Sequence, residues 1–131
     1  MIEARVADEW ILRLFPGEEL VAALQAVDTN SAVVLGGIGR VRAARLGFWN
    51  GSSYDETVID DPAELVSLQG NIATSSEGRA VHVHAVLAVR ERVFGGHLLA
   101  ATVEVTAEIS LFPLRAVQLE RDAGGLRPRA S

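Results

Sequence analysis

Apolar and other residues alternate along most of this chain, and this period of two limits its fold more than any other feature. In the segment Arg79 to Val89 every odd position after the first is apolar: Val81, Val83, Ala85, Leu87 and Val89. Successive side chains of a β-strand point to opposite faces, so such a pattern is typical of a strand with one buried face. The sequence therefore predicts a domain built largely from strands.

The same reading predicts about seven strands and one main helix. The expected strands are Trp10–Phe15, Ala32–Trp49, Tyr54–Ile59, Glu64–Thr74, Arg79–Val89, Leu98–Phe112 and Ala116–Arg121. Only Glu18 to Val27 shows the helical spacing of three and four, through Leu20, Val21, Leu24 and Val27. Strand follows strand through short turns, one of them expected around Glu91 to Gly96, which favours a largely antiparallel sheet.

A length of 131 residues is typical of one domain, which we place at residues 1–121. Residues 122–131 contain Gly124, Gly125 and Pro128, and we expect them to form a mobile C-terminal tail. Hydrophobic residues make up 49% of the chain and aromatic residues only 5%. The core must therefore be mostly aliphatic, and the apolar surplus fills either this core or a subunit interface.

Charge and composition exclude several kinds of protein. The formal net charge is −5, which disfavours non-specific binding to a phosphate backbone. Cysteine is absent, so disulfides, thiolate metal sites and cysteine nucleophiles are excluded. The first residues lack the apolar stretch of a signal peptide, and no apolar run approaches the ~18 residues of a membrane span. We expect a cytoplasmic protein.

The only concentrated chemistry in the sequence is a group of three histidines. His82 and His84 occupy alternate positions of one expected strand, so both side chains point to the same face. His97 follows Gly95 and Gly96, where the backbone is unusually free. Three imidazoles are a sufficient protein ligand set for a zinc ion of the catalytic type, with one position open. The alternative is three surface or interface histidines that hydrogen-bond to polar groups.

Hairpin geometry complicates a three-histidine site. If the residues from Arg90 to Gly96 form a tight hairpin, we expect His97 to pair near Ala88. His97 would then lie roughly 13 Å from His84, at ~3.3 Å per residue. A site within one chain would require a wide connection or a bulge, and otherwise His97 would come from a neighbouring subunit.

Several of these segments together resemble a known family. The run from Glu64 to Ile72 reads ELVSLQGNI, His-Val-His follows at positions 82–84, and Gly-Gly-His-Leu stands at positions 95–98. With Val105 to Ile109, these motifs resemble the PPC (plants and prokaryotes conserved) domain, which in plants accompanies AT-hooks in nuclear proteins. The resemblance runs from the first expected strand to Leu111, nearly the whole chain.

The resemblance implies an α+β fold, a curled antiparallel sheet with a helix, assembled as a homotrimer. A related fold occurs in acetolactate decarboxylase, whose zinc is held by a similar histidine pattern, and by that similarity His82, His84 and His97 are the expected metal ligands. Glu64 and Glu108 are candidates to orient a ligand imidazole, although each also fits an exposed strand residue. The chain has no AT-hook, so with its acidic charge we expect no direct DNA binding.

Three functional hypotheses remain open at this point. In the first, the chain is a homotrimeric PPC-domain protein with a divalent metal site, zinc by preference, and a regulatory or DNA-associated binding role. The second is a metal-dependent enzyme, of lyase or hydrolase type, acting on a small polar substrate. In the third, the trimer is an interaction unit without a metal.

Overall fold

Nine strands and one short helix make up the computed structural model, which describes residues 1–131. In chain order they are β1 (Ile2–Val6), β2 (Glu9–Leu14), α1 (Leu20–Gln25), β3 (Ala32–Trp49), β4 (Tyr54–Ile59), β5 (Ala63–Ser75), β6 (Gly78–Val89), β7 (Arg92–Pro113), β8 (Val117–Asp122) and β9 (Gly125–Ala130). The structure contains no helix with the length and apolar character needed to cross a membrane.

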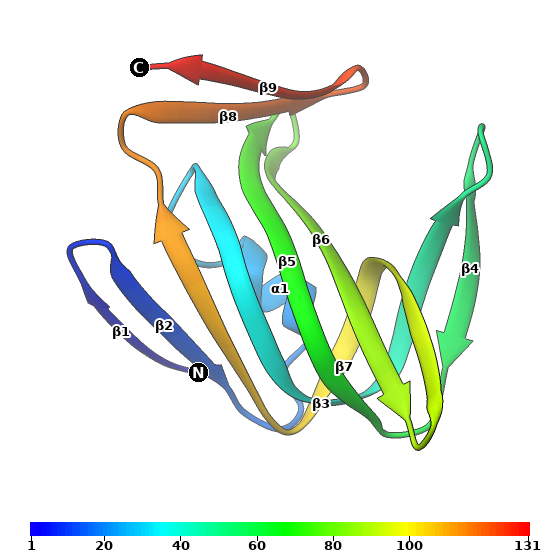
Figure 1. The fold of residues 1–131 in the computed structure, drawn as a ribbon. Helices are drawn as coiled ribbons and strands as arrows, with labels where there is room; N and C mark the ends of the chain where they lie inside the picture. Colours follow the sequence, from blue (N-terminus) through cyan, green and yellow to red (C-terminus); the bar gives the residue numbers. More distant parts are fainter.

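The strands form one strongly curled sheet (Figure 1). Four strands pair in a closed ring, because β3 pairs with β5 and β7, and β6 pairs with both of them as well. The strands β1 and β2 extend the sheet beyond β7, and β4 pairs with β3. All these pairings are antiparallel, whereas β8 meets β5 in a parallel bridge. The antiparallel character expected from the short turns is confirmed.

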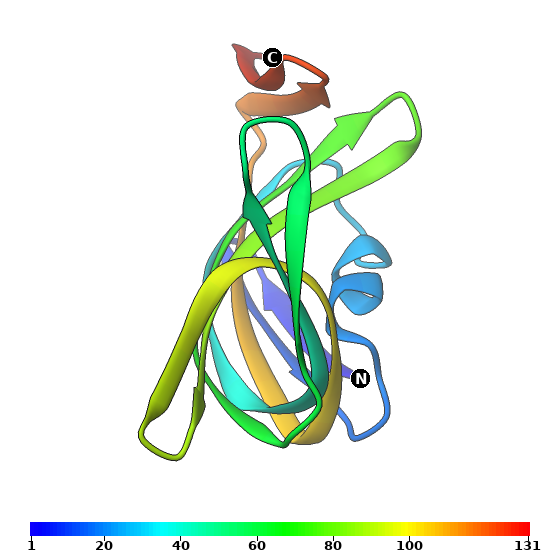
Figure 2. The same cartoon turned by 90° about the vertical axis from the view of Figure 1, so that its right-hand side faces the viewer.

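The core lies within the curl and is aliphatic apart from Trp10. Alternate residues of each long strand point inward, as in Val83, Ala85 and Leu87 of β6, all of which are at most 3% exposed. The helix α1 covers the sheet from one side (Figure 2), and its residues Leu20 and Leu24 complete the core. The period of two therefore identifies the buried face of the sheet correctly.

The helix is shorter than the expected segment Glu18 to Val27. Glu19 is its N-cap, and its carboxylate accepts hydrogen bonds from the backbone N–H groups of Val21 and Ala22. The same carboxylate also accepts from the N–H of Ala101 on β7, which ties the helix start to the sheet. The sequence predicted an α+β class, and the curled sheet and the single helix are both present. Because that helix has only six residues, the class is largely β.

The count of seven strands was too low, because two edge strands escaped the sequence pattern. The strand β1 was missed although Ile2, Ala4 and Val6 alternate with Glu3 and Arg5, and all five of its residues are exposed. The strand β9 falls within the segment expected as a tail, and pairs with β8 from Val117 to Asp122. Five of its six residues are exposed and one is Pro128, a residue tolerated only on sheet edges.

The connection between β6 and β7 also differs from the expectation. Val89 pairs directly with Arg92, so only Arg90 and Glu91 form the loop. Arg90 has a φ of 56°, the left-handed backbone that two-residue hairpin loops favour. The residues from Arg92 to Gly96, expected to belong to the turn, continue the strand instead.

Candidate metal centre

The first two histidines lie on the outer face of β6. Val83 and Ala85 point into the core, so His82 and His84, at the alternate positions, point outward. Nε2 of His82 and Nε2 of His84 are 3.2 Å apart. The prediction that the two imidazoles share one face is confirmed.

The third histidine lies directly across from the second. The two-residue loop at Arg90 sets the register in which His97 of β7 pairs with His84 of β6. Residues directly opposite each other on paired strands present their side chains on the same face. The predicted pairing of His97 near Ala88 is therefore wrong, since the loop occurs earlier in the chain than expected. Neither a wide connection nor a second subunit is needed to bring the three histidines together.

The three imidazoles surround a common point. Their ring centroids are 4.9 to 5.4 Å apart in all three pairs. One nitrogen from each ring can be chosen so that all three lie within 4.8 Å of one another. Nitrogens bound at 2.0–2.1 Å to one tetrahedral zinc ion would be about 3.3 Å apart. The Nε2 atoms of His82 and His84, 3.2 Å apart, lie close to this spacing.

Burial and neighbouring charge favour the neutral form of His97 and His82. The pKa of His97 is lowered to about 4, first by burial and then by the nearby His82, His84 and Arg121. The pKa of His82 is lowered by burial, then by Arg121 and His84. A metal ion binds only the neutral imidazole, so the depressed pKa values leave these two rings competent as ligands at pH 7.

An aromatic side chain from another hairpin covers His97. Tyr54, the first residue of β4, stacks on this imidazole with centroids 5.2 Å apart and an angle of 28° between the planes. Gly47 of β3, the strand partner of His97, leaves the necessary space. A Cβ atom on Gly47 would lie 2.8 Å from Cδ1 of Tyr54. The tyrosine thus holds His97 in place from outside the β6–β7 hairpin.

The other side of the histidine group is bounded by β5 and β8. Asn71 of β5 pairs with His82, and its Oδ1 accepts a 2.9 Å hydrogen bond from Nη2 of Arg121 on β8.

The backbones of β5 and β6 approach closely at Gly70, the residue before Asn71. A Cβ atom there would lie 2.7 Å from Cα of Val83 and would also collide with the carbonyl oxygen of His82. A glycine is therefore required for β5 to lie against the histidine strand.

The two candidate glutamates lie away from the histidines. Glu64 accepts from Arg40, with Oε1 3.2 Å from Nη1, and its strand partner is Ala88. Glu108 is exposed and pairs across the sheet with Arg13 and Ile38. No Asp or Glu side chain hydrogen-bonds to any of the three imidazoles. The structure brings His82, His84 and His97 together and does not bring Glu64 or Glu108 to them.

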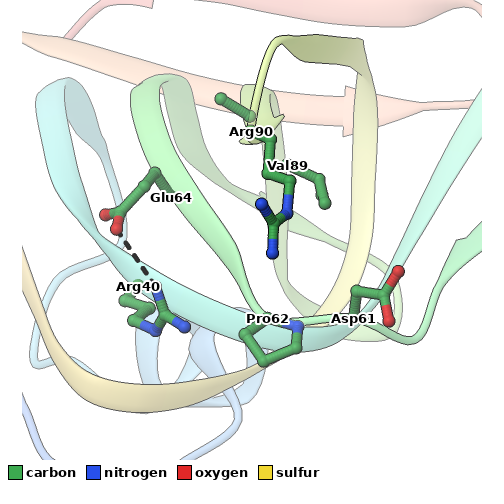
Figure 3. Close-up of a pocket in the computed structure, with 7 residues that line it drawn as sticks. Arg40, Asp61, Pro62, Glu64, Val89 and Arg90 are labelled. Atoms are coloured by element: carbon green, nitrogen blue, oxygen red, sulfur yellow. Dashed lines mark hydrogen bonds and ion pairs between the residues drawn. The ribbon is translucent and has the colours of Figure 1, made fainter.

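The pocket that contains Glu64 is also separate from the histidines. It has a volume of about 600 Å³, and Figure 3 shows Arg40, Glu64, Asp61 and Arg90 around it. Ala88 and Val89, the last two residues of β6, line it, whereas His82 and His84 lie in the middle of that strand. We refer to it below as the Arg40 pocket.

The residues present fit a metal ion better than they fit a purely structural cluster. Nδ1 of His97 is buried and has no hydrogen-bond partner, although buried polar atoms are nearly always satisfied. Two further imidazoles lie against it without any carboxylate or carbonyl to hydrogen-bond the rings. Three convergent imidazoles are the kind of donor set that binds zinc or a similar divalent ion.

Three contributing residues were missed at the level of sequence: Tyr54, Asn71 and Arg121. Tyr54 and Arg121 lie on segments distant from the histidines in the chain, and no spacing links them to His97 or His82. Asn71 belongs to the ELVSLQGNI run, so the motif marked its segment but not its contact.

Comparisons with known proteins identify the family and the fold of this chain. A protein-family model described as Plants and Prokaryotes Conserved (PCC) domain matches residues 1–114. Two similar solved structures are a plant- and prokaryote-conserved (PPC) protein from Pyrococcus horikoshii and a metal-containing protein from Archaeoglobus fulgidus. The first is 29% identical, covers 92% of this chain and 86% of its own, and has a TM-score of 0.81. The second is 28% identical, covers 95% and 94%, and has a TM-score of 0.82.

A third structure shares the fold at lower identity. This candidate DNA-binding protein from Ralstonia eutropha is 19% identical, with 98% of this chain and 94% of that chain covered and a TM-score of 0.80. A search of curated proteins found no match.

Proposed function

The chain belongs to the Plants and Prokaryotes Conserved domain family, and from this premise we propose that it is a homotrimeric protein that binds one zinc ion per chain through His82, His84 and His97. Its role is that of a binding protein for a small ligand, regulatory or DNA-associated through partners. The observation that carries the proposal is the convergence of three imidazole nitrogens within 4.8 Å inside one chain.

The choice of zinc follows from the donors. Imidazole suits zinc, copper, iron and nickel, whereas magnesium and calcium prefer oxygen ligands, which this group lacks. When bound, zinc supplies a Lewis acid at the outer surface of the sheet. The metal-containing protein from Archaeoglobus fulgidus, at 28% identity over 95% of this chain, supports a metal in this fold.

A second candidate function is a metal-dependent enzyme of lyase or hydrolase type for a small polar substrate. It is favoured by the number of ligands, since three protein donors leave a position open, as in catalytic rather than structural zinc sites. Such an enzyme also needs an acid or base within reach of the substrate. The candidate glutamates Glu64 and Glu108 do not contact the histidines, which favours the binding role.

Support for a trimer comes from apolar side chains that the single chain leaves in solvent. Ile11, Ile38 and Val105 are 52%, 57% and 60% exposed. Ile38 shares one surface hollow with Ile11 and another with Val105, so the three lie near one another on β2, β3 and β7, together with Glu108, which lines both hollows. Apolar areas of this kind are typical of subunit interfaces.

The proposed link to DNA is indirect. A candidate DNA-binding protein shares this fold, but the formal net charge of this chain is −5. Phosphate contacts by cationic side chains supply most of the affinity of a DNA-binding domain. We therefore propose that any association with DNA requires a partner.

The test is the metal content and mass of protein purified without an affinity tag. We expect about one zinc ion per chain by elemental analysis, and a particle of three times the 14.0 kDa chain mass by light scattering. Protein that carries no metal and retains none after titration with zinc chloride would refute the metal site. A monomer at micromolar concentration would refute the trimer without affecting the metal site.

A further inference from the structure

An arginine from the C-terminal hairpin lies beside the histidine group. The hairpin of β8 and β9 lies at the end of the sheet where β5 and β6 meet (Figure 1), and Thr74 of β5 pairs with Glu120. The next residue, Arg121, donates to Asn71, the strand partner of His82. Arg121 lies beyond residues 1–114, the segment that matches the family model.

Arg121 differs from the other two arginines of the hairpin, because it has no carboxylate partner. Arg127 pairs with Asp122 at 2.6 Å, and Arg129 pairs with Glu120 at 2.7 Å. Arg121 donates only to the neutral amide oxygen of Asn71, and its Nε is buried without any hydrogen-bond partner. A guanidinium has five N–H donors, so most of the hydrogen-bonding capacity of Arg121 is unused.

The guanidinium of Arg121 lies on the same face of the sheet as the histidines. It donates to the side chain of Asn71, which stands directly opposite His82 on the paired strand. A divalent ion held by the histidines would add a second positive charge to the same place. Two cations repel unless an anion lies between them, and the combined charge would attract one strongly.

We propose that Arg121 selects the ligand of the histidine-held metal, and that this ligand is a small molecule with a carboxylate group. The proposal rests on the metal site proposed above. The planar fork of a guanidinium matches the two oxygens of a carboxylate. A phosphate group carries more charge and is usually held by several cations or a row of backbone N–H groups, whereas this site offers a single arginine. Asn71 is a positioning residue that holds the guanidinium beside the imidazoles.

The experiment uses the full chain loaded with Co²⁺, whose visible absorption reports its ligands. Acetate is titrated as the probe at pH 7.5, with acetamide as the uncharged analogue and inorganic phosphate as the competing anion. The variants are Arg121→Gln, Arg121→Lys and Asn71→Ala, and the matched control is Arg129→Gln on the same hairpin. The cobalt spectrum without acetate shows that each variant is folded and loaded.

We expect acetate to change the spectrum of the wild type and of Arg129→Gln at the same concentration, and acetamide to have no effect. Arg121→Gln should require an acetate concentration at least about ten-fold higher for the same spectral change, because a charge-assisted hydrogen bond is lost. Arg121→Lys and Asn71→Ala should require acetate concentrations between those of the wild type and Arg121→Gln. Each of these variants keeps a cation near the histidines, but in a less favourable position.

Two results would overturn the proposal while leaving the metal site intact. One is cobalt binding with the same acetate dependence in the wild type and in Arg121→Gln. The other is a response to phosphate, but not to acetate, that depends on Arg121. A wild-type chain that binds no cobalt would refute the proposed metal site itself, and the ligand proposal with it.

Discussion

The histidine group in the middle of β6 and the Arg40 pocket at the end of that strand show what makes a surface feature a candidate site. The pocket is the more hollow of the two, at about 600 Å³. Its central cation is nevertheless satisfied, because Arg40 lies between Glu64 at 3.2 Å and Glu104 at 3.1 Å. At the histidine group, Nδ1 of His97 and Nε of Arg121 are buried without partners. Unsatisfied donors and acceptors, rather than volume, therefore distinguish the histidine group from the pocket.

The largest contrast between the histidine group and the Arg40 pocket should appear in metal affinity. We expect His84→Gln to weaken zinc binding by a factor of at least ~100, because loss of a partner behind the ligands already costs 10- to 100-fold. Calorimetric titration with zinc chloride measures the effect. The control is Arg40→Gln in the Arg40 pocket. A similar loss of zinc affinity in both variants would remove the distinction between the histidine group and the pocket.

A smaller effect is expected where the β5 backbone lies against the histidine strand. Gly70→Ala places a methyl group against the backbone of His82 and Val83, and should destabilise the fold by about 1–3 kcal/mol. Thermal unfolding should then begin several degrees lower. Gly95→Ala is the control, since a Cβ atom there would be 3.7 Å from the nearest atom. Equal melting temperatures for the two variants would contradict the close approach at Gly70.

The third expectation concerns acid, and it applies to the metal-free protein. The pKa of His97 is about 4 in the folded chain, against 6.5 for an ordinary histidine. Below pH 6.5 the unfolded chain takes up a proton that the folded chain does not, so stability falls as the pH drops from 6.5 to about 4. Above pH 6.5 His97 contributes no pH dependence. Urea unfolding across this range measures the slope.

The variant His97→Gln is the control for this acid dependence. It removes the titrating imidazole, so its stability should fall less steeply between pH 6.5 and 4 than that of the wild type. Parallel slopes in the two proteins would show that the imidazole of His97 is not the group responsible.

The smallest effect should come from the Arg40 pocket itself. Its ion pairs are exposed, with 38% of the Arg40 side chain and 61% of the Glu64 side chain in solvent. Exposed pairs of this kind contribute little to stability. Arg40→Gln should therefore melt closer to the wild type than Gly70→Ala does, with unchanged zinc affinity. A larger drop in melting temperature than that of Gly70→Ala would mean that the ion pairs of the Arg40 pocket also stabilise the fold.

The sequence predicted the faces of the strands better than their partners. Strand parity placed His82 and His84 side by side, because that relation depends only on local geometry. The position of His97 was mispredicted, since it depends on where the hairpin turns, and Arg90 turns without a glycine. The contacts of Tyr54 and Arg121 arise from pairing of distant segments, for which the chain carries no local pattern.

The edge strands were mispredicted for a different reason. Neither β1 nor β9 has a buried face. In β1 the alternation of Ile2, Ala4 and Val6 with charged residues is only five residues long, and in β9 Gly125 and Pro128 interrupt any alternation. The family motifs ELVSLQGNI and Gly-Gly-His-Leu compensated for such gaps, because together they identified the domain even where the strand pattern was incomplete.

The most direct test is anomalous diffraction at the zinc edge from crystals grown with zinc chloride. We expect one strong peak per chain, bounded by nitrogens of His82, His84 and His97 at about 2.0–2.1 Å. A peak at any other place in the chain, or none among the three imidazoles, would contradict the assignment of these histidines as a metal site.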